Sequence, residues 1–317
     1  MDMSTIKYIL KRILMAIATL VIIVFVLFVM LKLMPGTPFN DEKLTQAQKA
    51  LIYAEYGFDK PIWEQFVIYF KAMISGDFGI SFGIARNLEV SKLVGPRIIV
   101  SFSIGLAAAV LGTIIGVMLG IFSALKRNTI WDSLATMVSV LGVSIPSFVV
   151  CLLLLIFLGV NIKILPILYN SSRPIISAII PTIALSFSVV ANVARFTRSE
   201  MIEVLGSEYI NLAQSKGLDR RFVIKRHALR NTLVPIITIL APILVSLMTG
   251  SMVIEQICGI PGLGSLLVQA ITVNDYNVTM AVAFIYSVMY VVIMLVVDIL
   301  YGIIDPRIRL GKGKANE

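Results

Sequence analysis

Residues 98–125 read IIVSFSIGLAAAVLGTIIGVMLGIFSAL, and no charged side chain interrupts them. Since about 20 apolar residues in a helix cross the hydrocarbon core of a bilayer, this stretch predicts a transmembrane helix. Gly112, Gly116 and Gly120 recur every four residues within it. Small residues at this spacing let helix backbones approach closely in lipid, either within the chain or against a second membrane subunit.

The composition of the whole chain agrees with a membrane protein. Of its 317 residues, 58% are hydrophobic and 14% are charged, and the mean hydropathy is +0.94. Soluble domains carry about 25% charged residues, so this composition excludes a disordered protein, a secreted disulfide scaffold and a soluble enzyme. Two cysteines and a single histidine make a disulfide framework or a His-rich metal site improbable. The net charge of +9 is attributed to cytoplasmic loops rather than to nucleic-acid binding.

Five further stretches are long and apolar enough to span a bilayer. With residues 98–125 they predict an all-α membrane protein with six transmembrane helices, the others lying at about 13–31, 133–162, 175–194, 232–254 and 276–297. Three of these contain proline, at Pro146, at Pro181, and at Pro235 and Pro242. Neighbouring helices can satisfy the carbonyl groups that proline frees. We therefore expect kinked helices around a cavity, although kinks also occur in purely structural spans.

Lysine and arginine residues predict the orientation. They gather before the first predicted helix, after the second, between the fourth and fifth, and after the last, whereas the short connections on the other side hold only Lys163 and Arg173. The positive-inside rule then places both termini in the cytoplasm. The first apolar run is too long for a signal peptide and lacks a small-x-small cleavage site, so it is expected to remain as an anchor.

This topology divides the chain into four parts. Residues 1–33 form a cytoplasmic segment and the first helix, 34–96 an extracytoplasmic cap, 97–304 a core of five helices, and 305–317 a cytoplasmic tail. In the cap, residues 44–52 form a weak amphipathic face, and Pro61 opens a stretch with Trp63, Phe66, Val67, Phe70 and Ile74 at helical spacing. Such a cap could pack only on the membrane surface or could contact a delivery protein.

The cytoplasmic loop at about 196–231 is far longer than a turn and has its own pattern. Leu205, Tyr209, Leu212 and Ala213 form a short apolar stripe, and Gly217 is well placed to end a helix. Asp219 is a suitable N-cap for a second, basic helix. A basic amphipathic helix on the anionic inner leaflet would explain the charges. A protruding helix-turn-helix that docks into another protein explains both the charges and the apolar stripe.

Several motifs together resemble one family. They are PGTPF after the first predicted helix, YGFDKPIWEQFVIYF and SGDFGISFG in the cap, EYINLAQSKGLDRRFVIKRHALRNTLVP in the loop, GSMVIEQICGIPGLGSLL followed by DY, and VDILYGIIDPRIR. The sequence resembles the B-type membrane subunits of ATP-binding-cassette importers for oligopeptides and dipeptides. The resemblance covers nearly the whole chain and implies a type I importer permease fold in the bacterial cytoplasmic membrane.

In such importers the cytoplasmic loop carries a coupling helix that sits in a cleft of an ATPase subunit. Ala213 and Gly217 match the family's general Glu-Ala-Ala-(three residues)-Gly pattern, whereas Asn211 and Leu212 replace its first two residues and Pro235 comes late. The resemblance assigns the coupling role to Leu205, Tyr209, Leu212, Ala213, Lys216, Gly217, Leu218, Asp219, His227 and Asn231.

The resemblance also implies partners. These are a homologous second permease subunit, two cytoplasmic ATP-binding subunits, an extracytoplasmic peptide-binding protein, the peptide and the bilayer, with no nucleic acid. The chain would bind no cofactor, because ATP and Mg²⁺ would be held by the partner subunits. It lacks the G-x-x-x-x-G-K-[ST] phosphate loop, so we expect a transport subunit that is not itself an enzyme.

Few single residues offer other chemistry. Glu255, with Pro261, Gly262 and Gly264, could form an outer gate or contact the binding protein, or Glu255 could instead bind backbone N–H groups. Asp298 is expected to pair with a basic loop residue rather than to line the pathway. The serines at 144, 147, 186 and 188 have no His–Asp partner, which argues against nucleophilic catalysis.

Three classes of function were compared. A membrane-embedded enzyme would need paired carboxylates or a Ser–His arrangement inside the spans, and a self-sufficient channel or secondary transporter would need its own coupling charges there. Neither pattern is visible in the sequence. The expected function is that of a permease subunit of an ATP-driven peptide importer. The alternative is the same importer family carrying nickel or another small solute.

Overall fold

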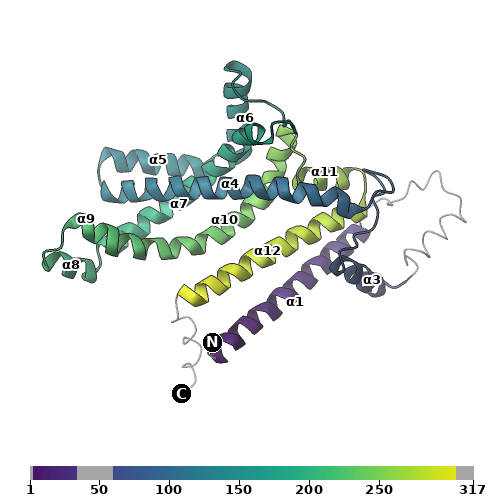
Figure 1. The fold of residues 1–317 in the computed structure, drawn as a ribbon, viewed down its shortest axis with the longest axis horizontal. Helices are drawn as coiled ribbons and strands as arrows, with labels where there is room; N and C mark the ends of the chain where they lie inside the picture. Colours follow the sequence, from purple (N-terminus) through teal and green to yellow (C-terminus); the bar gives the residue numbers. More distant parts are fainter. Residues whose placement is uncertain (1–2, 34–59, 305–317) are drawn as a thin grey trace, which may run out of the picture. The chain divides into compact units, whose positions relative to one another are not determined.

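The computed structural model describes residues 3–33 and 60–304, so the predicted amphipathic stretch at 44–52 and the tail at 305–317 lie outside the described residues. All the regular elements of the described part are helices, apart from one isolated antiparallel bridge between Ile80 and Glu89, and turns and irregular segments connect them (Figure 1). The chain forms two compact units. The first contains Met1–Val100 and Pro261–Leu295, and the second contains Ser101–Ile260 and Val296–Glu317.

The first unit packs helices from both ends of the sequence. It contains α1 (Met3–Leu33), α3 (Ile62–Ile74), the beginning of α4 (Val90–Leu125), α11 (Leu263–Thr272) and most of α12 (Tyr276–Ile304). One apolar cluster joins α1, α3 and α12 through Val24, Phe28, Met73 and Met280. A second joins α4, α11 and α12 through Val90, Val94, Leu263, Leu266, Ala270, Val278, Ala281 and Val282.

Helix α3 begins after Pro61, as its sequence predicted. Its packed face consists of Phe66, Tyr69, Phe70 and Met73, spaced for one side of a helix. The rings of Phe66 and Tyr69 lie 5.0 Å from Phe25 and 5.9 Å from Phe28 of α1, respectively. The Trp63, Val67 and Ile74 side chains of the predicted stripe are exposed instead. The face that packs is therefore rotated relative to the prediction.

The second unit is built around α7 (Pro174–Leu205), which packs against α5 (Ile130–Ser144), α6 (Ser147–Leu154) and α10 (Leu229–Cys258) and is also closely approached by α4. The π-helix η2 (Leu155–Asn161) continues α6. Between α7 and α10 lie α8 (Glu208–Ser215), α9 (Arg220–Val223) and a second π-helix, η3 (Ile224–Ala228). Helix α7 can serve as the centre of this unit because its buried residues are distributed along almost its whole length.

The glycines of α4 explain how that helix approaches α7. A Cβ atom on Gly112, Gly116 or Gly120 would come within 2.5–2.8 Å of Val189, Val193, or Thr197 and the Ala194 carbonyl, respectively. Such distances leave no room for a side chain. The glycine face therefore packs within this chain, which is the first of the two alternatives that the sequence left open.

Five of the described helices are long and apolar enough to cross a membrane. Two bent helix pairs pass the same test together, so there are up to seven spans if each pair counts as one span. The six predicted spans fall in this range. One predicted feature is wrong: residues 133–162 do not form a single kinked helix. Ile145 is extended and Pro146 starts a new helix, so α5 and the α6–η2 helix are bent by 102°. The cause is local, because a residue before proline disfavours the helical conformation.

Candidate functional site

The segment between α7 and α10 folds into a short helical hairpin. Helix α8 ends at Lys216–Gly217, where Gly217 takes a left-handed φ of +81°. A Cβ at Gly217 would meet nothing within 4 Å, so this position requires glycine for its backbone rather than for space. The Asp219 side chain accepts a hydrogen bond from the Arg221 N–H at 2.9 Å and caps α9. The helix end and the N-cap that the sequence predicted are both present.

The inner face of α8 attaches the hairpin to the long helices. Ile210 is fully buried in a cluster with Met201 of α7, Val223 of α9 and Ala228 of η3. Leu205 and Ala213, both predicted site residues, pack against the same cluster. The sequence analysis overlooked Ile210. Its spacing of three residues from Ala213 was the available signal, because residues at i and i+3 share a helix face.

The hairpin exposes four apolar side chains, which we call the apolar patch. They are Tyr209, Leu212, Leu218 and Phe222, with exposed fractions of 43%, 57%, 40% and 50%. The predicted stripe therefore divides between two faces, because Leu205 and Ala213 point inward while Tyr209 and Leu212 point outward. Exposed apolar groups of this size within a polar surround are typical of a protein-binding surface.

Two contacts link the apolar patch to η3 and to the start of α10. The Asn231 side-chain amide donates a hydrogen bond to the Tyr209 hydroxyl at 2.8 Å. The Phe222 ring lies edge-on to the His227 ring, with centroids 6.1 Å apart. His227 and Asn231, two predicted site residues, thus each contact one aromatic member of the patch. Among the described residues, no group of three or more His, Cys, Asp or Glu side chains could hold a metal ion.

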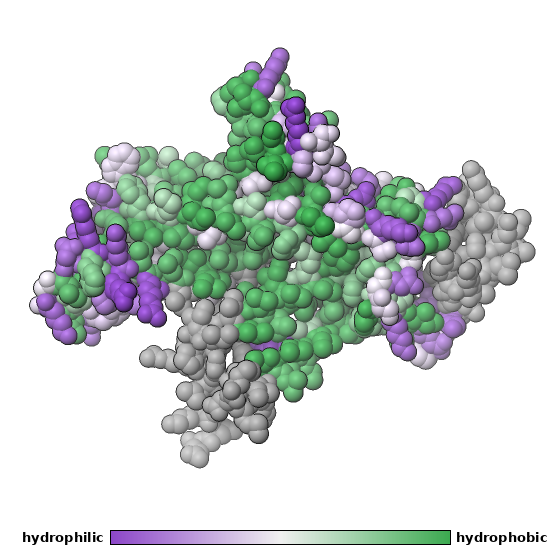
Figure 2. Space-filling view, viewed as in Figure 1, coloured by the Kyte–Doolittle hydropathy of each residue, from purple (hydrophilic) through white to green (hydrophobic). Residues whose placement is uncertain are grey.

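Exposed cations occur in the same stretch of chain as the apolar patch. They are Lys216, Arg220, Arg221, Lys225, Arg226 and Arg230, and Figure 2 shows hydrophilic surface over α8 and α9. The two ion pairs found among the described residues join Lys92 to Glu89 and Arg198 to Asp132, so neither involves these six cations. The hairpin therefore exposes four apolar side chains together with these six cations, which we call the cationic rim.

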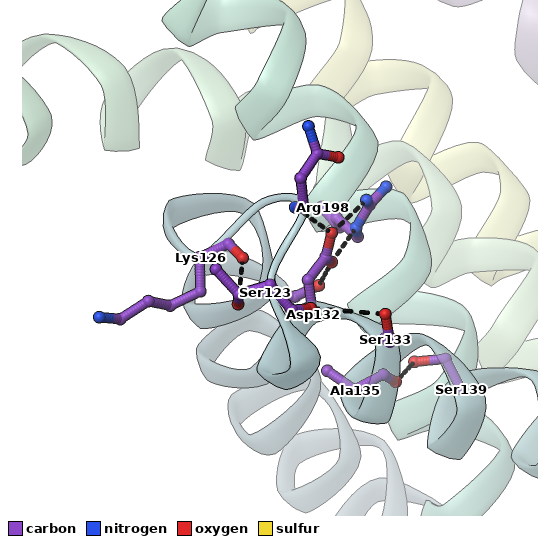
Figure 3. Close-up of polar contacts among 9 residues, drawn as sticks. Ser123, Lys126, Asp132, Ser133, Ala135, Ser139 and Arg198 are labelled. Atoms are coloured by element: carbon purple, nitrogen blue, oxygen red, sulfur yellow. Dashed lines mark hydrogen bonds and ion pairs between the residues drawn. The ribbon is translucent and has the colours of Figure 1, made fainter.

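A partly buried ion pair that was not predicted from the sequence joins the ends of α4 and α5 to α7 (Figure 3). The Arg198 guanidinium of α7 donates two hydrogen bonds to the Asp132 carboxylate of α5, at 2.7 and 2.8 Å. The same carboxylate accepts bonds from the Ser123 hydroxyl at 2.6 Å and the Asn128 N–H at 3.0 Å. Four donors on three segments fix the geometry here, seven residues before α7 ends at Leu205.

The predicted outer residues lie in different units, Glu255 in the second and Pro261, Gly262 and Gly264 in the first. Glu255 is buried in α10 and accepts a hydrogen bond from the Ser101 hydroxyl at 2.7 Å. Gly262 is the N-cap of α11, and both Gly262 and Gly264 are buried while Pro261 is exposed. This segment therefore starts a ten-residue helix. The side chain of Asp298 lies outside the described part of the structure.

Asp275 is a second acid that sequence reasoning missed. It is fully buried and accepts hydrogen bonds from the Ser81 hydroxyl at 2.5 Å and from the Gly83 and Ile84 N–H groups at 2.9 and 3.1 Å. These bonds attach the turn-rich part of the predicted cap to the start of α12. Burial, together with the charges of Asp275 and Asp77, raises the pKa of Tyr69 above its usual range.

The comparisons with known proteins give the family. Residues 116–310 match the family described as "Binding-protein-dependent transport system inner membrane component", and residues 5–87 match its N-terminal counterpart. The chain belongs to this family. It is therefore a multi-pass permease of the cytoplasmic membrane.

Similar proteins extend over nearly the whole chain. The dipeptide transport system permease protein DppB of Lactococcus lactis is 45% identical over 96% of this chain and 100% of its own length. The oligopeptide transport system permease protein OppB of Salmonella typhimurium is 40% identical over 96% of this chain and 99% of its own length. A chain of the inward-facing MetNI methionine ABC transporter matches 67% of this chain and 96% of its own, with a TM-score of 0.56 and 14% identity. That likeness concerns the fold alone, and it agrees with the importer permease fold that the sequence predicted.

Proposed function

We propose that this chain is a permease subunit of an ATP-binding-cassette importer that moves dipeptides or oligopeptides across the cytoplasmic membrane. The observation that carries the proposal is the 40–45% identity, over 96% of the chain, to permease proteins of dipeptide and oligopeptide transport systems. In this role the chain provides the pathway and does not itself hydrolyse ATP. A homologous permease, two ATP-binding subunits with their ATP and Mg²⁺, and an extracytoplasmic peptide-binding protein would complete the transporter.

The apolar patch is the proposed contact with an ATP-binding subunit. Burying one large apolar side chain contributes about 1.5–3 kcal/mol, so four such groups offer a substantial docking surface. The cationic rim adds attraction for acidic residues around an apolar cleft. Gly217 and Asp219 support docking by setting the path of the chain between α8 and α9, and Lys216 and Leu218 flank that turn.

Movement of the docked hairpin can be transmitted through its inner face. Ile210 packs on Met201 near the end of α7, while the Tyr209–Asn231 hydrogen bond reaches the first residues of α10. A displacement of α8 would therefore act on two long helices at once, because close-packed contacts transmit displacement. This is the proposed link between ATP-driven rearrangement of the partner and movement of the helices in the membrane.

The outer residues are a separate part of the proposal. Glu255, Pro261, Gly262 and Gly264 could act at the outer mouth or meet the binding protein. The burial of Glu255 and its bond from Ser101 favour the structural alternative, in which this carboxylate ties α10 to the adjoining part of α4.

Substrate class can be tested by uptake. Cells that express the complete transporter should accumulate a labelled dipeptide or a labelled pentapeptide, and deletion of this chain should abolish that accumulation. Labelled nickel, offered to the same cells, tests the alternative substrate in this family. Uptake of nickel without uptake of either peptide would contradict the proposed function.

A further inference from the structure

The two cysteines of the chain meet in the second unit, although 107 residues separate them. The Sγ atoms of Cys151 and Cys258 lie 3.5 Å apart, and the two residues are 0% and 2% exposed. They are the only cysteines in the sequence, and both are free thiols. Their separation in the sequence gives no indication of this contact.

Three segments converge at this thiol pair. Cys151 lies in α6, which begins after the break at Pro146. Cys258 is the last residue of α10, and Gly259 follows with a left-handed φ of +63°. The Cys258 carbonyl accepts a hydrogen bond from the Tyr169 N–H at 2.8 Å, which brings in the connection between η2 and α7. The thiol pair therefore lies where α6, the connection between η2 and α7, and the end of α10 meet.

We propose that Cys151 and Cys258 form a reversible oxidation site that closes to a disulfide and fastens α6 to the end of α10. Hydrogen peroxide is the oxidant class. One thiol loses its proton, and its thiolate attacks a peroxide oxygen, which breaks the O–O bond; the departing hydroxide takes up that proton, so the products are a sulfenic acid and water. The second sulfur then attacks the oxidised sulfur, forming the S–S bond and releasing a second water. Overall, two thiols and one peroxide give one disulfide and two waters, with the peroxide reduced.

The geometry favours this closure. An S–S bond is about 2.05 Å long, so the sulfur atoms need to approach by about 1.5 Å, which is within reach of small side-chain rotations. Because both thiols are buried, a small oxidant should reach them through local opening, whereas bulky thiol reagents should react slowly with the intact protein. Each sulfur is also positioned to capture the oxidised form of the other before further oxidation.

Formation of the disulfide is tested on the complete transporter in membranes. After treatment with hydrogen peroxide, the chains are denatured, and their remaining thiols are coupled to a polyethylene-glycol maleimide that shifts each chain on a gel. Reduced wild-type protein should take two labels, and oxidised wild-type protein should take none until a phosphine reductant restores both. The variants Cys151→Ser and Cys151→Ala should still take one label at Cys258 after brief treatment. Two labels on peroxide-treated wild-type protein would overturn the proposal.

The expected effect of the disulfide on transport rests on the proposed function of peptide transport. The disulfide should lower peptide uptake several-fold in wild type, reductant should restore it, and Cys151→Ser should transport normally and resist peroxide. Disulfide formation with unchanged uptake would overturn the regulatory role while leaving the site intact. Absence of uptake before any treatment, in both proteins, would instead contradict the proposed function, so the two failures are distinguishable.

Discussion

At the scale of single residues, Asp132 determines how three helix ends meet. Its carboxylate receives four hydrogen bonds from Arg198, Ser123 and Asn128. Burying the Asp132 carboxylate without such donors would cost free energy, and so would leaving the Arg198 guanidinium without this carboxylate partner. Sequence reasoning could not find this pair, because 66 residues separate Asp132 from Arg198 and neither residue stands out in its own helix.

We expect Asp132→Asn to destabilise the protein by about 1–3 kcal/mol, since the neutral amide leaves the Arg198 charge unpaired. The measurement is the thermal unfolding of the assembled transporter in detergent. The double variant Asp132→Asn/Arg198→Met should recover part of the loss, because it removes the unpaired charge as well. Equal unfolding temperatures for the wild type and Asp132→Asn would show that the pair contributes nothing.

At the scale of elements, the sequence predicts the long helices well and their ends less well. Uninterrupted apolar runs give α1, α4, α7, α10 and α12, because spanning a bilayer requires such length. The break after α5 and the short helix α11 were not predicted, because a sequence stretch of only eight to fifteen residues fits a kinked span, a turn or a separate helix equally well. The two faces of α8 were merged for the same reason, since so short a helix gives too few turns to define a stripe.

The close approach of α4 to α7 gives a prediction with a matched control. Gly120→Ala would place a Cβ within 2.6 Å of the Ala194 carbonyl and the Thr197 Cβ, so the backbones have to separate. Gly105→Ala meets nothing within 4 Å, and alanine is favoured over glycine in helices by about 1 kcal/mol. Gly120→Ala should therefore lower the yield and unfolding temperature of the assembled protein, whereas Gly105→Ala should not. Identical behaviour of the two variants would contradict the packing described here.

At the scale of the whole molecule, the positive-inside pattern predicts on which side of the membrane each connection lies. In a background without Cys151 and Cys258, a cysteine placed at the exposed Asn170 should react with an impermeant thiol reagent added outside the cell. A cysteine at the exposed Asn211 of α8 should react only after permeabilisation. Labelling of position 211 from outside would reverse the orientation and with it the proposed role of the hairpin.

The central claim is that the apolar patch between α7 and α10 couples this permease to an ATP-binding partner. Leu212→Asp tests it most directly, because Leu212 is the most exposed member of the patch. Losing one apolar anchor and burying a carboxylate should weaken docking about tenfold or more. Lys225→Gln is the control, since one surface cation contributes about 1 kcal/mol or less.

The decisive measurement is the amount of ATP-binding subunit that co-purifies with each variant from membranes, taken together with peptide uptake by the same cells. The account predicts that Leu212→Asp inserts at normal levels, retains little ATP-binding subunit and transports no peptide, while Lys225→Gln resembles the wild type. Wild-type recruitment and uptake in Leu212→Asp would contradict it.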